Sequence, residues 1–264
     1  MESSELIGVF DSGVGGLSVL AEIRRELPLA DLMYFADQGR APYGVRPLDE
    51  VSAMSGEVSE WLLDRGADVI TIACNTASAA ALHQLRARYP EVPFVGMEPA
   101  VKPAALNTSS GIIGVVATAA TFQGELFASV VQRHASGARV LTKACPTWVE
   151  LVERGEIDGP RARGQVEQCL AGLLEGGADT IVLGCTHFSF LIPLIEDVAG
   201  PGVAVVDPGP AVARQVRRVV GYSDGDARLI LATSGDPARL REWARRLAGI
   251  EGTEPVLACV WNGG

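Results

Sequence analysis

Short runs of apolar, mostly β-branched residues recur along the chain, and most end in glycine or a small polar residue before a helical pattern begins. These runs predict strands at 6–10, 32–35, 68–73, 93–96, 112–116, 139–142, 179–183, 203–206 and 228–232. Apolar residues at helical spacing predict helices at 17–26, 48–65, 77–88, 123–133, 164–176, 211–220 and 239–247. Strands that alternate with helices are typical of parallel βαβ units. Nearly continuous apolar runs such as VITIA and TIVLG indicate sheets covered on both faces.

The pattern occurs twice. Residues 66–78 have the sequence GADVITIACNTAS and residues 177–189 have GADTIVLGCTHFS, so that Cys74 and Cys185 take the same place, 111 positions apart. The apolar run that starts at Ile7 has a counterpart that starts at Ile113. We therefore predict an α/β fold of two homologous lobes, each with a mainly parallel sheet flanked by helices, and an active site in the cleft between them.

The repeat also suggests where one lobe ends. The first copy of the repeat gives way to the second near residues 99–107, and the tail after about residue 211 has no counterpart in the repeat. We predict a first lobe formed by residues 1–98 and 210–264 and a second lobe formed by residues 99–209. Sites in parallel sheets form at the carboxyl ends of the strands. The residues at such ends are Asp11, Cys74, Thr118 and Cys185.

Composition narrows the class of protein. The 264 residues are 48% hydrophobic with a net charge of −10, which permits a large core and argues against a nucleic-acid-binding surface. We expect neither a secretory signal nor a membrane span, because no basic leader and no apolar segment of about 20 residues occurs. The five cysteines are widely spaced without a CxxC motif, which predicts free thiols in a reducing cytoplasm.

The matched cysteines are the strongest candidates for chemistry. A single cysteine after an apolar strand is usually a small core residue, but two at equivalent places in a duplication favour two thiols that face one substrate. This arrangement suits an enzyme that removes a proton from one face of a carbon and returns one to the other. If helices begin at these cysteines, the helix dipole and backbone N–H groups are expected to lower the thiol pKa toward neutrality.

Other candidates are weaker on their residues alone. The sequence supports two interpretations of the turn DSGVGG at 11–16 equally well, a helix cap and a ligand-binding turn. The turn lacks the spacing of a nucleotide-binding motif. His187 suits a general acid or a residue that tunes Cys185, and no second cluster completes a metal site. Asp37 and Glu153 cannot be told from surface charges. The two lysines follow no motif of a pyridoxal enzyme, which favours chemistry without a cofactor.

These residues resemble those of the aspartate/glutamate racemase superfamily, and most closely its glutamate racemases. The similarity covers essentially the whole chain. Its segments are IGVFDSGVGGLSVL at 7–20, APYG at 41–44, ACNTASA at 73–79, EPA at 98–100, CPTWVELVE at 145–153, GCTHF at 184–188 and TSGD at 233–236.

The resemblance implies a cofactor-independent, cytoplasmic enzyme that interconverts L- and D-glutamate and supplies D-glutamate for peptidoglycan. It implies that Cys74 and Cys185 are the catalytic thiols, with the first acting on D-glutamate. The implied assisting residues are Asp11, Glu153 and His187. The implied substrate-binding residues are Asp11, Ser12, Asp37, Pro42, Tyr43, Gly44, Asn75, Thr76, Thr118, Thr186 and His187. No metal is expected, and a homodimer without nucleic-acid or membrane partners is expected.

The chain departs from the family's usual pattern at His187-Phe188-Ser189, at Glu150, at Gln38-Gly39 and at Gly124. None of these departures changes a cysteine. Alternative functions are a related isomerase of aspartate, a hydantoin or maleate, a non-catalytic amino-acid sensor, and a dithiol redox protein. The residues that flank the two cysteines favour glutamate.

Overall fold

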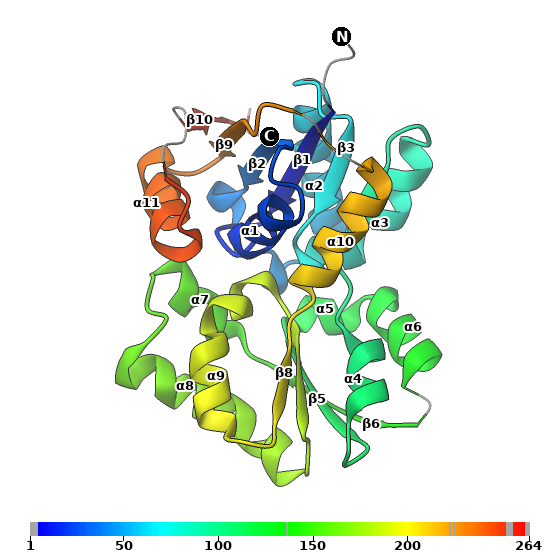
Figure 1. Cartoon of the computed structure of the whole chain (residues 1–264), viewed down its shortest axis with the longest axis vertical. Helices are drawn as coiled ribbons and strands as arrows, with labels where there is room; N and C mark the ends of the chain where they lie inside the picture. Colours follow the sequence, from blue (N-terminus) through cyan, green and yellow to red (C-terminus); the bar gives the residue numbers. More distant parts are fainter. Residues whose placement is uncertain (1–4, 136, 222, 224, 252–255, 262–264) are drawn as a thin grey trace.

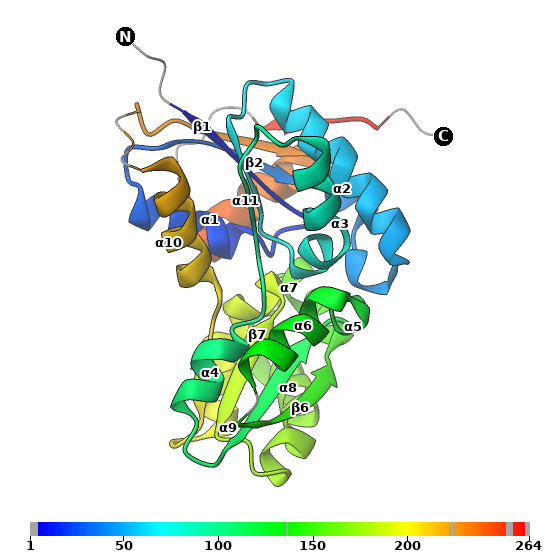
Figure 2. The same ribbon diagram turned by 90° about the vertical axis from the view of Figure 1, so that its right-hand side faces the viewer.

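A computed structural model describes residues 5–135, 137–221, 223, 225–251 and 256–261. The chain forms two α/β lobes, one above the other in Figures 1 and 2, each built on a sheet in which every strand pair is parallel. The predicted fold class is therefore confirmed. The boundaries predicted for the two lobes stay a prediction.

The sheet of the first lobe has six strands in the order β10-β9-β2-β1-β3-β4. The strands are β1 (Leu6–Asp11), β2 (Asp31–Ala36), β3 (Val69–Ile72), β4 (Phe94–Gly96), β9 (Leu229–Thr233) and β10 (Leu257–Ala258). Helices α1 (Leu17–Glu26), α10 (Gly209–Val220) and α11 (Pro237–Ala248) bury apolar side chains in one core cluster, and α2 (Leu48–Leu63) and α3 (Asn75–Arg88) in another. Figure 2 shows α1 and α10 on the opposite side of this sheet from α2 and α3.

The second lobe has a four-stranded sheet in the order β6-β5-β7-β8. Its strands are β5 (Ile112–Ala117), β6 (Arg139–Ala144), β7 (Thr180–Gly184) and β8 (Ala204–Val206). Helices α4 (Val101–Asn107) and α6 (Glu125–His134) share one core cluster, and α7 (Pro146–Glu153), α8 (Gly159–Glu175) and α9 (Ile192–Ala199) share another. The order β6-β5-β7-β8 repeats the order β2-β1-β3-β4, so that β3 and β7, which precede the two cysteines, take equivalent places.

Four helices and one strand were not predicted: α4, α5 (Ala119–Gln123), α7, α9 and β10. They are short, and three of these helices contain a proline at or near the first turn, which weakens the periodic signal. The single helix predicted at 123–133 is wrong at its start, because the chain leaves helical geometry at Gly124 between α5 and α6. The described part of the chain also contains three 3-10 turns, η1 (Gln38–Arg40), η2 (Tyr43–Val45) and η3 (Thr186–Leu191).

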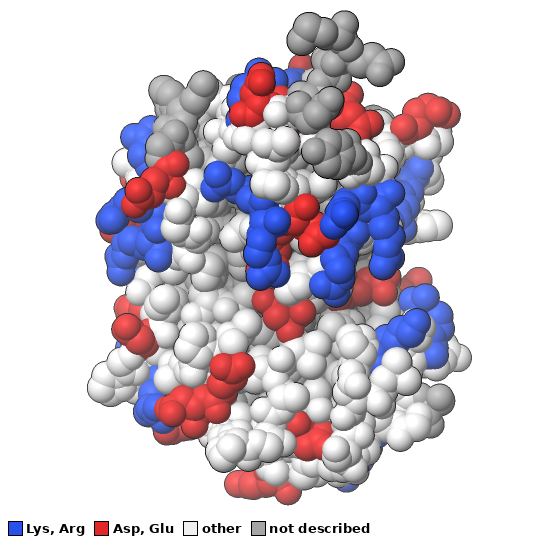
Figure 3. Space-filling view, in the orientation of Figure 1, with Lys and Arg blue, Asp and Glu red and all other residues white. Residues whose placement is uncertain are grey.

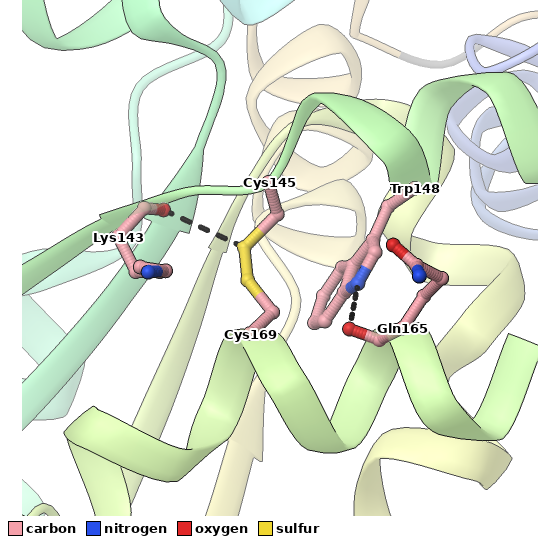
Figure 4. The surroundings of a disulfide bond; sticks show 5 residues. All are labelled: Lys143, Cys145, Trp148, Gln165 and Cys169. Carbon is pink, nitrogen blue, oxygen red and sulfur yellow. Dashed lines mark hydrogen bonds between the residues drawn. A yellow bond between two sulfur atoms is a disulfide. The ribbon is translucent and has the colours of Figure 1, made fainter.

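Cys145, at the start of α7, is disulfide-bonded to Cys169 of α8 (Figure 4). Their Cα atoms are 6.2 Å apart, within the usual range. The prediction of free thiols throughout is therefore wrong for Cys145 and Cys169, whereas Cys74, Cys185 and Cys259 are free. The sequence held no signal for this pair, because α7 was not predicted and only its packing on α8 brings the two sulfurs together.

The disulfide makes a testable prediction. Iodoacetamide added to the denatured protein without reductant should label three of the five cysteines, and all five after reduction, as counted by intact mass. Cys169→Ser should lower the free energy of unfolding by about 3 kcal/mol, because the bond closes a loop between residues 24 positions apart. Five labels without reductant would show that the two thiols do not pair.

No helix in the part of the chain that the structure describes is long and apolar enough to cross a bilayer. On the face drawn in Figure 3, Lys and Arg side chains of the upper lobe lie next to Asp and Glu side chains, and both lobes also show uncharged surface. This face therefore carries both signs of charge.

Candidate active site

A cavity of about 170 Å³ lies where the carboxyl ends of β1, β3, β5 and β7 meet. Both lobes line it. Its lining residues are Ser12, Pro42, Tyr43, Gly44, Val45, Cys74, Asn75, Thr76, Thr118, Ala119, Ala144, Pro146, Val149, Glu150, Cys185, Thr186 and His187. Cys74 and Cys185 therefore share one cavity, as the duplicated motif predicted.

Cys74 ends the turn after β3 and caps the amino terminus of α3. Its sulfur accepts a hydrogen bond from the backbone N–H of Ala77 at 3.4 Å, and its thiol lies 3.8 Å from the Ser12 hydroxyl. Burial and, after it, the charge of Asp11 raise the pKa of Cys74 to about 12, despite the Ala77 N–H. The expectation that the helix start lowers this pKa is therefore wrong, because desolvation outweighs the helix. Cys74 is a thiol at rest and is equipped to donate a proton.

Cys185 follows β7 and belongs to a chain of polar contacts. Its sulfur lies 3.7 Å from Nδ1 of His187, and Nε2 of His187 lies 2.8 Å from Oε1 of Glu153. The same Glu153 oxygen accepts the backbone N–H of Val14 at 2.9 Å, which links α7 to the first lobe. Cys185, His187 and Glu153 therefore form an ordered relay of thiol, imidazole and carboxylate.

The electrostatics of this relay favour a charged imidazole. Burial lowers the pKa of His187, but the hydrogen bonds to Cys185 and Glu153 outweigh it and raise that pKa well above its usual value. Burial works to raise the pKa of Glu153, but the hydrogen bond and charge of His187 lower it below its usual range. The imidazolium thus lies between the Glu153 carboxylate and the sulfur of Cys185.

The glycine-rich turn packs directly against this relay. A Cβ atom on Gly13 would lie 2.0 Å from Oε1 of Glu153, and one on Gly15 would lie 2.3 Å from Nδ1 of His187. Glycine at both places thus lets the backbone approach Glu153 and His187 closely, and a side chain there would have to displace them. The turn therefore packs against the relay, and its role in ligand binding stays a prediction.

Asp11 lies behind the cavity at the end of β1. One carboxylate oxygen accepts the Gly13 N–H at 2.9 Å and the other accepts the Thr186 hydroxyl at 3.0 Å. Burial raises the pKa of Asp11, although the charge of His187 opposes the shift. Asp11 therefore fixes the position of Thr186 across the junction of the two lobes.

Neutral hydrogen-bonding groups complete the wall. The hydroxyls of Thr76 and Thr118 are 3.0 Å apart, and Thr121, which the sequence did not single out, joins both within 3.3 Å. Asn75 donates from its Nδ2 to the sulfur of Met97, and its Oδ1 is buried with no hydrogen-bond partner among the described residues. Oxygen and nitrogen of an amide are assigned from such neighbours, so Asn75 offers one free amide end to a ligand.

The predicted site residues fall into two groups. Those that line the cavity are Ser12, Pro42, Tyr43, Gly44, Cys74, Asn75, Thr76, Thr118, Cys185, Thr186 and His187, whereas Asp11, Glu153 and Asp37 lie outside its lining. Val149 and Glu150 also line the cavity. They were not predicted as site residues, because the helix that carries them, α7, was not predicted. Among the described lining residues there is no Lys or Arg, and no three described His, Cys, Asp or Glu side chains gather as metal ligands.

Comparisons with known proteins agree with this fold. The family model Asp/Glu/Hydantoin racemase matches residues 9–216. A glutamate racemase from Roseiflexus sp. is 46% identical over 93% of both chains, and one from Pseudomonas aeruginosa is 46% identical over 98% of this chain and 95% of that one. The crystal structure of Escherichia coli glutamate racemase with L-glutamate and the activator UDP-MurNAc-Ala has a TM-score of 0.88 at 29% identity, covering 98% of this chain and 100% of that chain. Glutamate racemase RacE1 from Bacillus anthracis has a TM-score of 0.86 at 30% identity, covering 98% and 97%.

Proposed function

Since the chain belongs to the Asp/Glu/hydantoin racemase family and, within it, to the glutamate racemases, we propose that it interconverts L- and D-glutamate by proton transfer between Cys74 and Cys185. The observation that supports this mechanism best is the placement of both free thiols on one cavity, each at the end of an equivalent strand. A two-base racemisation needs one proton acceptor and one proton donor, so we infer that the two thiols enter the reaction in different protonation states.

With L-glutamate, the Cys185 thiolate takes the Cα proton, and the Cys74 thiol gives its proton to the opposite face of the same carbon. The C–H bond that breaks leaves its electron pair on Cα, and that pair forms the new C–H bond. The site ends with a Cys185 thiol and a Cys74 thiolate, the form that acts on D-glutamate in the reverse direction. No electron is gained or lost, so the step requires no redox partner.

The Cα proton is far less acidic than a thiol, so the wall must stabilise negative charge on the way to the transition state. We assign this task to the hydroxyl of Thr76 and to the backbone N–H groups that begin α3 and η3. The free Oδ1 of Asn75 instead accepts a hydrogen bond from the substrate ammonium. Thr118 orients Thr76 from the second lobe. Ser12 and the segment Pro42–Tyr43–Gly44 contact the side-chain carboxylate, and Asp11 acts through Thr186.

We further propose that the D-glutamate serves peptidoglycan synthesis, as the family implies. L-glutamate in the Escherichia coli relative supports glutamate over aspartate, hydantoins or maleate. A cytoplasmic location, the homodimer and catalysis without a cofactor stay predictions. The sensor and the dithiol redox protein are less well supported, because a ligand sensor does not need the Cys185–His187–Glu153 relay.

Circular dichroism in D2O tests the proposed reaction. Purified protein with L-glutamate and no added cofactor should lose the ellipticity of the substrate until it reaches zero, because both enantiomers have the same free energy. Mass analysis should show one deuterium at Cα of the product. A folded, reduced protein that leaves L-glutamate unchanged would contradict the proposal, and the same assay with L-aspartate would then test the closest alternative.

A further inference from the structure

The Asp37 carboxylate lies at the crossing point of three distant parts of the chain. It follows β2, is 0% exposed and is absent from the cavity lining. Four side chains donate to it. They are Arg40 through Nε at 2.7 Å, Tyr43 through its hydroxyl, Ser234 through its hydroxyl at 2.5 Å and Trp261 through Nε1 at 2.9 Å.

The four donors divide evenly between the two oxygens. Arg40 and Tyr43 donate to Oδ2, and Ser234 and Trp261 donate to Oδ1. An ionised carboxylate offers about four lone-pair positions. Its acceptor capacity is thus filled by the protein, which leaves no lone pair for a substrate ammonium or a proton in transfer. The geometry fits a group that holds other residues in place.

One of the residues held in this way is Tyr43. Its side chain is 1% exposed, and its backbone lies between Pro42 and Gly44 in the cavity wall. Burial and the charge of Asp37 raise the pKa of Tyr43, so its phenol stays neutral and donates. The wall segment has little freedom on its other side, since a Cβ atom on Gly44 would lie 2.7 Å from the Thr118 side chain in the second lobe.

Trp261 reaches Asp37 from the carboxyl-terminal part of the chain. Its ring centroid lies 5.7 Å from that of Phe35, and the Arg40 guanidinium stacks over it at 4.1 Å. The segment before it is fixed by pairing of β10 with β9 and by the Cys259 N–H, which donates to the Thr233 carbonyl at 2.8 Å. A residue 224 positions from Asp37 therefore completes the set of donors behind the cavity wall.

We propose that Trp261 is a positioning residue of the racemase, which acts through Asp37 and Tyr43 to fix the Pro42–Gly44 wall of the substrate cavity. This inference rests on the proposed function. Loss of the Trp261 N–H leaves one lone pair of a buried carboxylate without a partner, and the set of donors shifts toward Oδ2, where Tyr43 is bound. Because the wall binds substrate and does not transfer the proton, the effect falls on KM.

Trp261→Phe keeps an aromatic ring but removes the N–H together with part of the ring system. We expect a KM for D-glutamate roughly three- to tenfold higher, with kcat within about twofold of the wild type. Ser234→Ala removes the other donor to Oδ1 and should change KM in the same direction. Trp61→Phe is the matched control, because Trp61 packs tilted against the same Phe35 ring, with ring centroids 4.8 Å apart, and is not one of the four donors.

A double-mutant cycle separates positioning from general destabilisation. Trp261→Phe and Tyr43→Phe act on one carboxylate, so the KM change of the double variant should be smaller than the product of the single changes. Unchanged KM in both Trp261→Phe and Ser234→Ala, an equal KM change in Trp61→Phe, or a loss confined to kcat would overturn the inference. Failure of the proposed function is distinct, since the wild-type protein would then not racemise glutamate at all. If Trp261→Phe does not fold, Ser234→Ala decides the question.

Discussion

Serine at either Cys74 or Cys185 is expected to lower the rate of glutamate racemisation by about 10³-fold or more in both directions. A serine hydroxyl is a far weaker acid than a thiol, so it neither loses a proton to act as base nor gives one up readily at the opposite face. Each variant keeps one thiol, but a racemase needs both, because the proton must leave one face of Cα and arrive at the other.

Racemisation is measured by circular dichroism from L- and from D-glutamate, with far-ultraviolet spectra and thermal unfolding to check the fold. Cys259→Ser is the matched control, because this buried free thiol is not among the residues that line the cavity. It should keep near-normal turnover. Near-normal turnover of Cys74→Ser or Cys185→Ser would instead disprove the two-thiol mechanism.

The single-thiol variants also test which cysteine faces which enantiomer. In D2O, Cys74→Ser keeps the Cys185 relay and should exchange the Cα proton of L-glutamate faster than that of D-glutamate. Cys185→Ser should show the reverse preference. The opposite pattern would exchange the roles assigned to the two thiols while leaving the two-thiol mechanism intact.

The framework of this site is visible in the sequence because it depends on local pattern. Each of the nine predicted strands has a counterpart in the structure, and the repeat around Cys74 and Cys185 predicted that both thiols lie at equivalent strand ends. Parallel sheets place the carboxyl ends of their strands at one edge, so the strand pattern places each thiol at that edge of its own sheet. The packing of the two lobes then brings the two edges together.

What the sequence could not predict depends on contacts between distant segments. Glu153 and Asp37 look like surface charges until α7 is packed on η3 and Trp261 is brought behind β2. The raised pKa of Cys74 has the same origin, because burial is a property of the folded cavity and the helix start is a property of the local chain. Short helices that begin with proline carry too little periodicity to be found, and the disulfide between α7 and α8 was hidden with them.

Asparagine at His187 is expected to lower kcat by about 10²- to 10³-fold, with a smaller change in KM. The imidazole lies 3.7 Å from the sulfur of Cys185, and its positive charge faces the atom that we propose takes the proton from L-glutamate. An asparagine side chain is neutral at every pH and cannot replace that charge. A change confined to KM would instead make His187 a binding residue.

This prediction has an internal control. L- and D-glutamate have equal free energies, so the ratio of kcat/KM in the two directions must equal one for every variant. In His187→Asn, kcat/KM must therefore fall by the same factor from either enantiomer, even if kcat and KM change by different factors. Unequal kcat/KM values would reveal a contaminating activity.

The pH profile of Glu153→Gln should show how the charge on His187 is maintained. In the wild type, the pKa of His187 is raised, so the imidazole stays protonated at pH values above the usual pKa of histidine. The charge is lost only as the pH rises through that raised pKa. Replacing the carboxylate by an amide removes the anion that supports the charge, so the pKa of His187 should fall. The alkaline limb of kcat/KM should then move to lower pH in Glu153→Gln and be absent in His187→Asn.

Glu156→Gln is the control, because Glu156 lies outside the relay and pairs with Arg161. An alkaline limb at the same pH in Glu153→Gln and the wild type would show that His187 does not set it.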